Sequence, residues 1–213
     1  MKALKVATLL LALFPTLSQA RPVSYVGGWT VLSDSNRQSS SLLTHYTTTP
    51  KQSWGIRVER DRSNDFTLTA IQPTLLVKRW FGTDYQANVY ATAGLGQARQ
   101  TGTGENNNDL AGFVGVMADW ETRRHFLSYQ NRYLDAGTLG GGFTQAARVG
   151  WAPYEGDTGD LHTWLMLEVD HRPVHDQPVG LTPLVCFFKG AAMVELGYTL
   201  NNHQPLINFA YRF

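Results

Sequence analysis

Apolar and polar residues alternate along most of this chain from residue 24 onward, and this alternation constrains the fold more than any other feature. Successive side chains of a β-strand point to opposite faces, so a period of two predicts strands rather than helices. Clusters of turn-forming residues interrupt the pattern. We expect an all-β protein with twelve strands, near 24–33, 41–48, 53–60, 66–81, 86–98, 109–120, 125–135, 143–152, 161–172, 182–188, 191–200 and 204–213.

Charged residues are scarce in this sequence. They make up 16% of the chain, against about 25% in a typical soluble domain. A soluble sandwich needs charge on its outer face, whereas a barrel in lipid carries apolar residues there. The composition therefore favours a transmembrane, antiparallel, up-and-down β-barrel of about twelve strands. Ten strands are an alternative, because residues 182–200 can also be interpreted as one long strand and a bacterial barrel is expected to have an even number. Eight strands are also possible.

The first twenty residues have the features of an export signal. Two lysines precede a short apolar run, and Ser18-Gln19-Ala20 places small residues at the positions that signal peptidase reads. The run is shorter than the ~20 residues of a membrane-spanning helix, although an uncleaved anchor is the alternative interpretation. We expect a signal peptide over 1–20, cleaved near Ala20, and a single barrel domain over 21–213.

The expected mature chain is close to neutral. Removal of Lys2 and Lys5 lowers the number of Lys and Arg from 18 to 16, against 17 Asp and Glu. Such a chain has no electrostatic reason to bind nucleic acid. The glycine-rich segments lack the lysine and the strand–turn–helix setting of phosphate-binding loops. We expect no nucleic-acid partner, no cofactor and no metal.

Large aromatic residues lie next to the predicted turns. If the strands alternate up and down from a periplasmic start, these aromatics gather near one rim of the barrel. Aromatic rings prefer the interface between lipid and water, where they form a girdle in membrane barrels. A core of tryptophans flanking turns in a soluble sandwich is the alternative. The predicted girdle consists of Trp54, Trp80, Trp120, Trp151, Trp164, Tyr211 and Phe213.

The last ten residues carry the most specific signal. One face of the segment 204–213 carries Ile207, Phe209, Tyr211 and Phe213, and the other carries mostly small and polar residues. A chain that ends on a strand-final Phe resembles the terminal signature by which outer-membrane proteins are recognised for insertion. Together with the signal and the alternation, it resembles the class of small Gram-negative outer-membrane β-barrels. The resemblance implies location in the cell outer membrane, contact with its lipid, and recognition of this strand by the barrel-assembly machinery.

The same alternation predicts which side chains point into the barrel. Setting the apolar face of each strand outward leaves basic and acidic groups inside in nearly equal number. Balanced charges of this kind can pair across a narrow lumen, whereas a ring of one sign would favour ion selectivity. The interior is therefore either filled by salt bridges or a narrow polar pore. The predicted lumen-lining residues include Arg57, Glu59, Arg132, Arg148, Glu168, Asp170, Glu195 and Arg212.

One segment raises the possibility of an enzyme. Glu168, Asp170, His171 and His175 lie at the end of a predicted strand and the start of a loop. A histidine beside carboxylates can act as a general base for a barrel enzyme that modifies lipid or peptide at the outer rim. However, Asp170 and His171 are adjacent on a strand and should point to opposite faces. No nucleophile motif accompanies them.

The sequence therefore favours an outer-membrane barrel with a structural role or with a narrow pore for a small polar solute. Two alternatives remain open from the sequence, namely the barrel enzyme and a soluble periplasmic β-barrel or sandwich that binds a ligand. With the periplasmic start, the predicted loops at 99–108, 136–142 and 173–181 face the outside.

Overall fold

The computed structural model describes residues 22–36, 38–101, 107–157, 159–173 and 178–213. The predicted signal peptide and its cleavage site therefore lie outside the described residues. No helix in the described part of the chain is long and apolar enough to cross a membrane. One short 3-10 helix, η1 (Gly137–Leu139), interrupts the strands. The strands are β1 (Trp29–Ser35), β2 (Ser39–Thr49), β3 (Gln52–Asp61), β4 (Phe66–Phe81), β5 (Gln86–Gln100), β6 (Asn108–Glu121), β7 (His125–Asp135), β8 (Gly141–Trp151), β9 (His162–His171), β10 (Val179–Lys189), β11 (Ala192–Thr199) and β12 (Gln204–Arg212).

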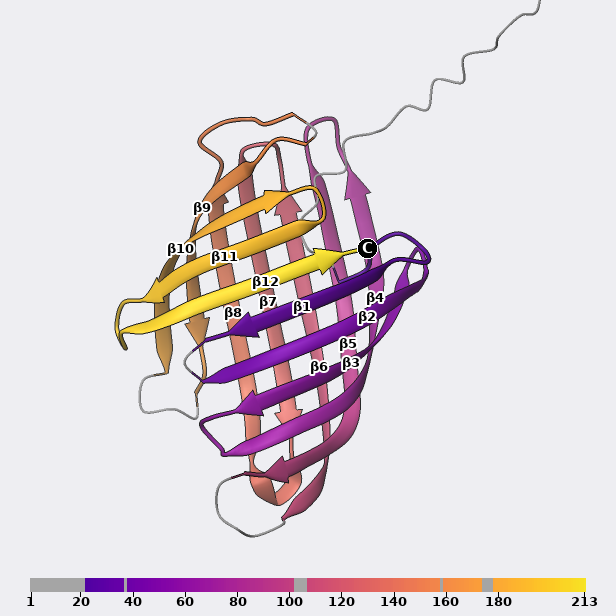
Figure 1. The fold of residues 1–213 in the computed structure, drawn as a ribbon, viewed down its shortest axis with the longest axis vertical. Coiled ribbons are helices and arrows are strands. Elements are labelled where there is room, and N and C mark those ends of the chain that lie inside the picture. The colour runs from indigo at the N-terminus through magenta and orange to yellow at the C-terminus, as the bar shows by residue number, and fades with distance from the viewer. Residues whose placement is uncertain (1–21, 37, 102–106, 158, 174–177) are drawn as a thin grey trace, which may run out of the picture.

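The twelve strands form one closed antiparallel barrel. Each strand pairs with its neighbours in the sequence, and β12 pairs with β1 to close the sheet (Figure 1). At the seam, Trp29 and Phe213 exchange two backbone hydrogen bonds, of 2.7 and 3.0 Å. Closure leaves no unpaired edge, which is what lipid requires of a membrane-spanning sheet. The prediction of an up-and-down barrel with twelve strands is confirmed, and the alternatives with ten or eight strands are wrong.

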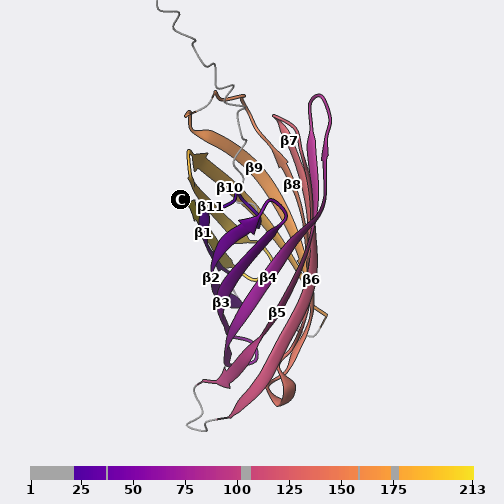
Figure 2. The same cartoon turned by 90° about the vertical axis from the view of Figure 1, so that its right-hand side faces the viewer.

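The barrel has two rims that differ in what they contain. The rim that contains Trp29 and Phe213 also contains the turns after β2, β4, β6, β8 and β10, and we call it the C-terminal rim. The opposite rim contains the turns after the odd-numbered strands. The barrel is taller on the side of β4, β5 and β6, which have 16, 15 and 14 residues and extend far toward the opposite rim (Figures 1 and 2).

Alternation divides each strand between an outer and an inner face. On β12, Ile207 and Phe209 point outward and are 53% and 40% exposed, whereas Leu206 and Asn208 point inward and are buried. Large apolar side chains are exposed in the same way over the rest of the outer surface, including Ile56, Ile71, Leu95, Leu110 and Val114. A soluble protein rarely exposes so much contiguous apolar area. This surface is suited to lipid, and it argues against the soluble alternative.

Apolar side chains fill parts of both ends of the interior. Near the opposite rim, Phe66, Leu68, Phe113 and Leu134 pack together with small alanines. Near the C-terminal rim, a second cluster forms from residues of β7, β9 and β10 with the residue after β8, namely Phe126, Ala152, Trp164, Met166, Leu184, Cys186 and Phe188. Polar and charged side chains occupy the region between the two clusters. The interior is thus constricted at its ends and polar in its middle.

The start of the first strand differs from the prediction. Residues 24–28 form turns rather than strand, because Gly27 adopts a left-handed conformation with φ of 88° and redirects the chain. This places the side chain of Val23 inside the barrel, where it is 2% exposed and packs on Leu76 and Tyr90. The Ser53 hydroxyl donates to the Pro22 carbonyl at 2.7 Å and holds the segment in place. Residues 22–28, which precede β1, therefore fold into the C-terminal rim.

Candidate functional site

The candidate site is a cavity inside the barrel that is lined by charged, polar and apolar side chains. Its volume is about 370 Å³, which is within the range of small-molecule sites. Asn36, Ser39 and Arg172 line it toward the opposite rim, whereas Pro22 and Asp119 line it toward the C-terminal rim. The cavity therefore extends along the barrel axis rather than into one wall.

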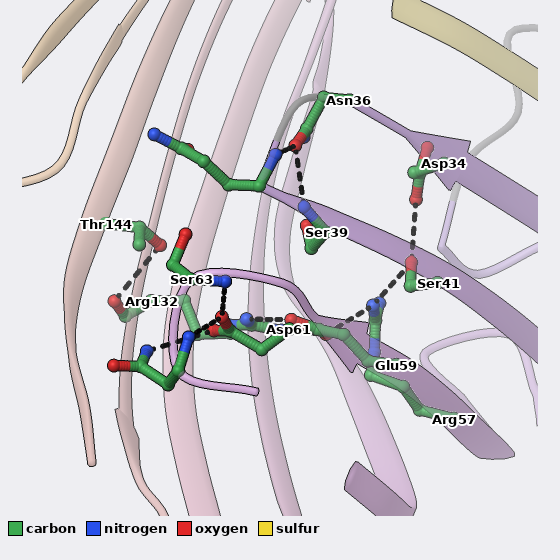
Figure 3. A network of polar contacts seen from close by, with 12 residues as sticks. Asp34, Asn36, Ser39, Ser41, Arg57, Glu59, Asp61, Ser63, Arg132 and Thr144 are labelled. Carbon is green, nitrogen blue, oxygen red and sulfur yellow. Dashed lines mark hydrogen bonds and ion pairs between the residues drawn. The ribbon is translucent and has the colours of Figure 1, made fainter. Parts of the chain in front are cut away.

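A group of hydrogen-bonded side chains around Glu59 spans this cavity. The two terminal nitrogens of Arg132 donate to the two carboxylate oxygens of Glu59 at 2.6 and 2.5 Å, which is a bidentate pair. Arg57 also donates to Glu59, at 3.3 Å, and binds Gln72 Oε1 and Ser41 Oγ at 2.7 and 3.0 Å. We call Ser41, Arg57, Glu59, Gln72 and Arg132 the Glu59 cluster; Figure 3 shows Ser41, Arg57, Glu59 and Arg132 with their neighbours.

The pair between Glu59 and Arg132 crosses the lumen. Glu59 lies on β3 and Arg132 on β7, and three strands separate them in the sheet. The ring of Phe113 on β6 lies beneath both guanidinium groups, with its centroid 6.0 Å from Arg57 Cζ and 5.4 Å from Arg132 Cζ. Contacts of a cation with an aromatic face add to the electrostatic stabilisation of the cluster. The Glu59 cluster therefore joins two walls of the barrel across the cavity.

Space for the Phe113 ring depends on a glycine in the neighbouring strand. A Cβ atom on Gly94 would lie 2.1 Å from Cε1 of Phe113, far inside van der Waals contact. Gly94 points inward from β5 opposite Phe113 in the β5–β6 register. The absence of a side chain here allows the ring to lie under Arg57 and Arg132.

A second cluster of charged side chains lies on the wall that β8, β9, β11 and β12 form. Arg148 on β8 donates to Glu168 on β9, and to Glu195 on β11 at 2.9 Å. Asn208 on β12 donates to Glu195 Oε2 at 2.8 Å. These four residues, which we call the Arg148 cluster, connect strands that are not neighbours in the sheet. Every carboxylate of this cluster accepts hydrogen bonds, as a charge taken out of bulk water requires.

Some polar groups of the interior were not among the predicted site residues. Near the C-terminal rim, Arg79 Nε donates to Asn88 Oδ1 at 2.6 Å, and Asn88 Nδ2 donates to Asp119 Oδ1 at 2.6 Å. Asp34 and Arg172 also line the cavity. The alternation of the sequence predicts that Asp119 points inward, because its neighbour Trp120 is exposed on the outer face. Arg172 follows the last residue of β9, where alternation ends.

The structure places the predicted lumen residues as follows. Arg57, Glu59 and Arg132 belong to the Glu59 cluster, and Arg148, Glu168 and Glu195 belong to the Arg148 cluster. Asp170 lines the cavity, 3.9 Å from Arg172 Nε. Arg212 lies opposite Thr30 of β1 in the register, on the same face of β12 as Asn208 and Ala210.

One residue of the predicted aromatic girdle does not lie on the outer surface of the barrel. Most members lie on the outside at the C-terminal rim and are between 37% and 58% exposed, namely Trp54, Trp80, Trp120, Trp151, Tyr211 and Phe213. Trp164, in contrast, is 3% exposed and points into the barrel, where its ring packs edge-on against Phe126. It lies on the same strand face as Glu168, so its inward direction follows from alternation. The placement of Trp164 in the girdle is therefore wrong.

The candidate catalytic residues do not come together. Glu168 is bound to Arg148, and Asp170 points into the cavity. His171 is on the opposite face of β9, where its Nδ1 lies 3.0 Å from Gln145 Nε2. His175 lies outside the described residues. Among the residues that the structure describes, no group of three or more His, Cys, Asp or Glu is arranged to hold a metal ion. The strand geometry gives no support to a catalytic site that uses Asp170 and His171 together.

Comparisons with known proteins yield structural likeness only. No protein-family model matches the chain, and no curated protein sequence matches it significantly. The structural alignment with the KdgM porin covers 87% of this chain and 99% of the porin chain, with 12% identity and a TM-score of 0.49. The β domain of the Bordetella autotransporter BrkA covers 88% of this chain and 98% of its own, with 10% identity and a TM-score of 0.49. OmpT, an outer-membrane protein of Vibrio cholerae, has 9% identity and a TM-score of 0.30.

The architecture of the chain itself defines its class. A closed barrel of twelve antiparallel strands has an apolar outer face, an aromatic girdle at one rim and a polar, charged interior. This combination is that of the outer-membrane β-barrel proteins.

Proposed function

We propose that the chain resides in the cell outer membrane and passes small polar solutes through a narrow lumen. The observation that supports this proposal most directly is the cavity of about 370 Å³ whose lining residues extend toward both rims. A barrel with a purely structural role needs no such space, since side chains can fill the interior of a small barrel. Polar groups along a hollow of this kind can replace the hydration shell of a solute.

The charged clusters set the width of the proposed passage. The Glu59–Arg132 pair crosses the lumen toward the opposite rim, and the Arg148 cluster projects from the other wall. Both clusters are held by several hydrogen bonds, so the cross-section stays small. The solutes that fit are therefore small and polar, and larger oligomers are excluded.

Export and assembly belong to the same proposal. A signal peptide over 1–20 would deliver the chain to the periplasm, and the assembly machinery would recognise the strand that ends at Phe213. The apolar outer face supports final residence in lipid. Fractionation of cells tests this location, because a folded outer-membrane barrel is recovered with the membrane and shifts its gel mobility on boiling. Recovery in the soluble periplasm without a mobility shift would contradict it.

Swelling of liposomes that contain the purified full chain tests the passage. We expect vesicles to swell in isotonic glycine or arabinose and to stay unchanged in raffinose. The matched control is the same protein added after boiling, which cannot form the barrel. In a second arm, the double variant E59Q/R132Q removes the charge pair that crosses the lumen, and swelling in arabinose should become faster. If protein that shows the mobility shift of a folded barrel causes no swelling, the proposed passage is contradicted and a structural role is favoured instead.

A further inference from the structure

Three arginines lie on the outer surface of the barrel near the opposite rim. Arg60 is the penultimate residue of β3, Arg62 follows this strand, and Arg99 is the penultimate residue of β5. Alternation directs Arg60 and Arg99 outward, because the residues before them, Glu59 and Ala98, are buried in the interior. We call Arg60, Arg62 and Arg99 the arginine patch.

The sheet register brings the arginine patch onto one area of the wall. Thr67 of β4 lies opposite Arg60 on one side and opposite Arg99 on the other. Adjacent strands are about 4.8 Å apart, so about 10 Å separates the backbones of these two arginines. Their long side chains can bridge this span. Arg62 extends over the outer face of β2, where its Nη2 donates to Ser40 Oγ.

The arginine patch carries an excess of positive charge. Its acidic neighbour on the outer surface is Asp65, which pairs with Arg60 at 3.0 Å. Three guanidinium groups against this one carboxylate give a formal net charge of +2. In the part of the chain that the structure describes, no carboxylate lies within 4.0 Å of the guanidinium groups of Arg62 or Arg99.

Three further carboxylates near this rim are held by the backbone of loops instead. Asp61 accepts a hydrogen bond from the N–H of Asn64, Asp109 from that of Thr138, and Asp135 from that of Gly137, at 2.8 to 2.9 Å. Asp61 and Asp109 also lie on the inward faces of their strands. Asp135 lies on β7, two strands beyond the strand of Arg99. These groups therefore leave the charge of the arginine patch in place.

The arginine patch borders directly on an apolar area of the outer wall. On β3, the next outward residue toward the C-terminal rim is Val58, which is exposed beside Leu42 of β2. On β5, Leu95 is exposed four residues before Arg99 and lies on the same outer face. The outer wall thus changes from apolar to basic over one or two outward positions.

The height of this boundary agrees with the surface of a bilayer. Arg99 is twelve residues along β5 from Ala87, which pairs with the girdle residues Trp80 and Trp120. At about 3.4 Å per residue and a strand tilt of about 40°, Arg99 lies about 30 Å above the girdle. The apolar band of a membrane barrel is about 25 Å tall. The arginine patch is therefore at the level of lipid head groups.

The basic side chains are confined to one side of the barrel at this level. Near the opposite rim, the outer faces of β7 to β12 carry no Lys or Arg among the residues that the structure describes. A guanidinium group matches phosphate oxygens with two parallel hydrogen bonds. Several such groups above an apolar wall suit a ligand that has phosphate at one end and acyl chains at the other.

We infer that the arginine patch binds the phosphate groups of an anionic membrane lipid. The occupant is a lipid of the leaflet around this rim whose head group carries phosphomonoesters, as lipid A does. Its phosphates contact the guanidinium groups, and its acyl chains lie along the apolar wall of β3 to β5. The inference rests on the proposed residence in the outer membrane and is independent of passage through the lumen.

Native mass spectrometry of the refolded full chain in dodecyl maltoside micelles tests this inference, with diphosphoryl lipid A as the probe. We expect wild-type protein to bind it at least about tenfold more tightly than dephosphorylated lipid A. The variant R60Q/R62Q/R99Q should lose at least about tenfold in affinity for the phosphorylated probe, because three charged contacts with phosphate are removed. The control K51Q/R123Q/K189Q removes three exposed basic groups at the C-terminal rim, and its affinity should stay within about twofold of wild type.

Each outcome decides the inference. Heat-modifiable mobility reports whether each variant is folded, and the single variants R62Q and R99Q, with an expected loss of about twofold each, replace the triple variant if it does not fold. Equal binding of phosphorylated and dephosphorylated lipid A, or equal affinities of the folded arginine variant and the control, overturns the inference. Binding of glucose 1-phosphate as tightly as lipid A overturns a lipid as the occupant. Recovery in the soluble periplasm contradicts the proposed location instead, and an absence of current contradicts the passage alone.

Discussion

At the scale of single residues, Glu59 is the acidic centre of the polar interior. Its side chain is 3% exposed and is held by Arg57 and Arg132. A carboxylate so far from bulk water is stable only while its guanidinium partners remain. The alternation of the sequence predicts that Glu59 and Arg132 face inward. It does not predict that they meet, because their contact depends on how the closed barrel brings β3 toward β7.

The variant E59Q should destabilise the barrel. Loss of the carboxylate leaves two guanidinium groups without their anion, and we expect a loss of about 3 kcal/mol in the free energy of unfolding, the lower end of the range for a buried pair. The cost lies at that end because the side chains of Arg57 and Arg132 remain 16% and 23% exposed. Urea unfolding of the protein in lipid vesicles, followed by tryptophan fluorescence, measures this change.

An exposed ion pair serves as the control for E59Q. Asp65 pairs with Arg60 at 3.0 Å, and the two side chains are 65% and 35% exposed. The variant D65N should therefore change the free energy of unfolding by less than about 1 kcal/mol. Equal losses in E59Q and D65N would contradict the role of Glu59 as the acidic centre of the interior.

At the scale of strands, Gly94 of β5 controls how closely β6 can place a ring in the lumen. We expect G94A to destabilise the barrel by about 1–3 kcal/mol, because the added methyl group overlaps the Phe113 ring and displaces it from Arg57 and Arg132. The same urea unfolding experiment measures it. The control is G112A in β6, since a Cβ on Gly112 would meet its nearest atom at 3.4 Å. A stability of G94A that matches that of G112A would argue against this steric account.

The terminal strand gives a prediction about assembly rather than stability. The backbone of Phe213 pairs with Trp29, while its ring is 58% exposed in the girdle. The variant F213A keeps the backbone hydrogen bonds, so its urea midpoint in vitro should shift little. In cells, its amount in the outer membrane should fall several-fold if the assembly machinery reads the terminal ring. Immunoblots of membrane fractions measure this, with Y211A as the matched change in the same girdle.

The strands show how far a sequence pattern can be extended to a structure. Period-two alternation predicts all twelve strands, because the inside and outside of a closed barrel differ so strongly. It fails for residues 24–28, because the left-handed conformation of Gly27 interrupts the extended chain and β1 begins only at Trp29. At Trp164 two signals disagree, because its proximity to a turn favours the girdle whereas its shared strand face with Glu168 favours the interior. Side-chain direction within a strand is the stronger signal.

At the scale of the whole molecule, the interior is divided into layers along the axis. Apolar clusters occupy parts of both ends, and the charged clusters and the cavity lie between them. The sequence predicts the inward polar set but not this layering, because the layering depends on strand tilt and on the relative register of distant strands. The same geometry sets the width of the proposed passage, since charged groups from several strands meet inside the lumen.

Single-channel recording of the full chain in planar bilayers tests the central claim most directly. The account predicts small, discrete current steps from wild-type protein that shows the mobility shift of a folded barrel. It also predicts larger steps from E59Q/R132Q, because the charge pair across the lumen is removed. An absence of current steps from folded wild-type protein would contradict a passage through the barrel.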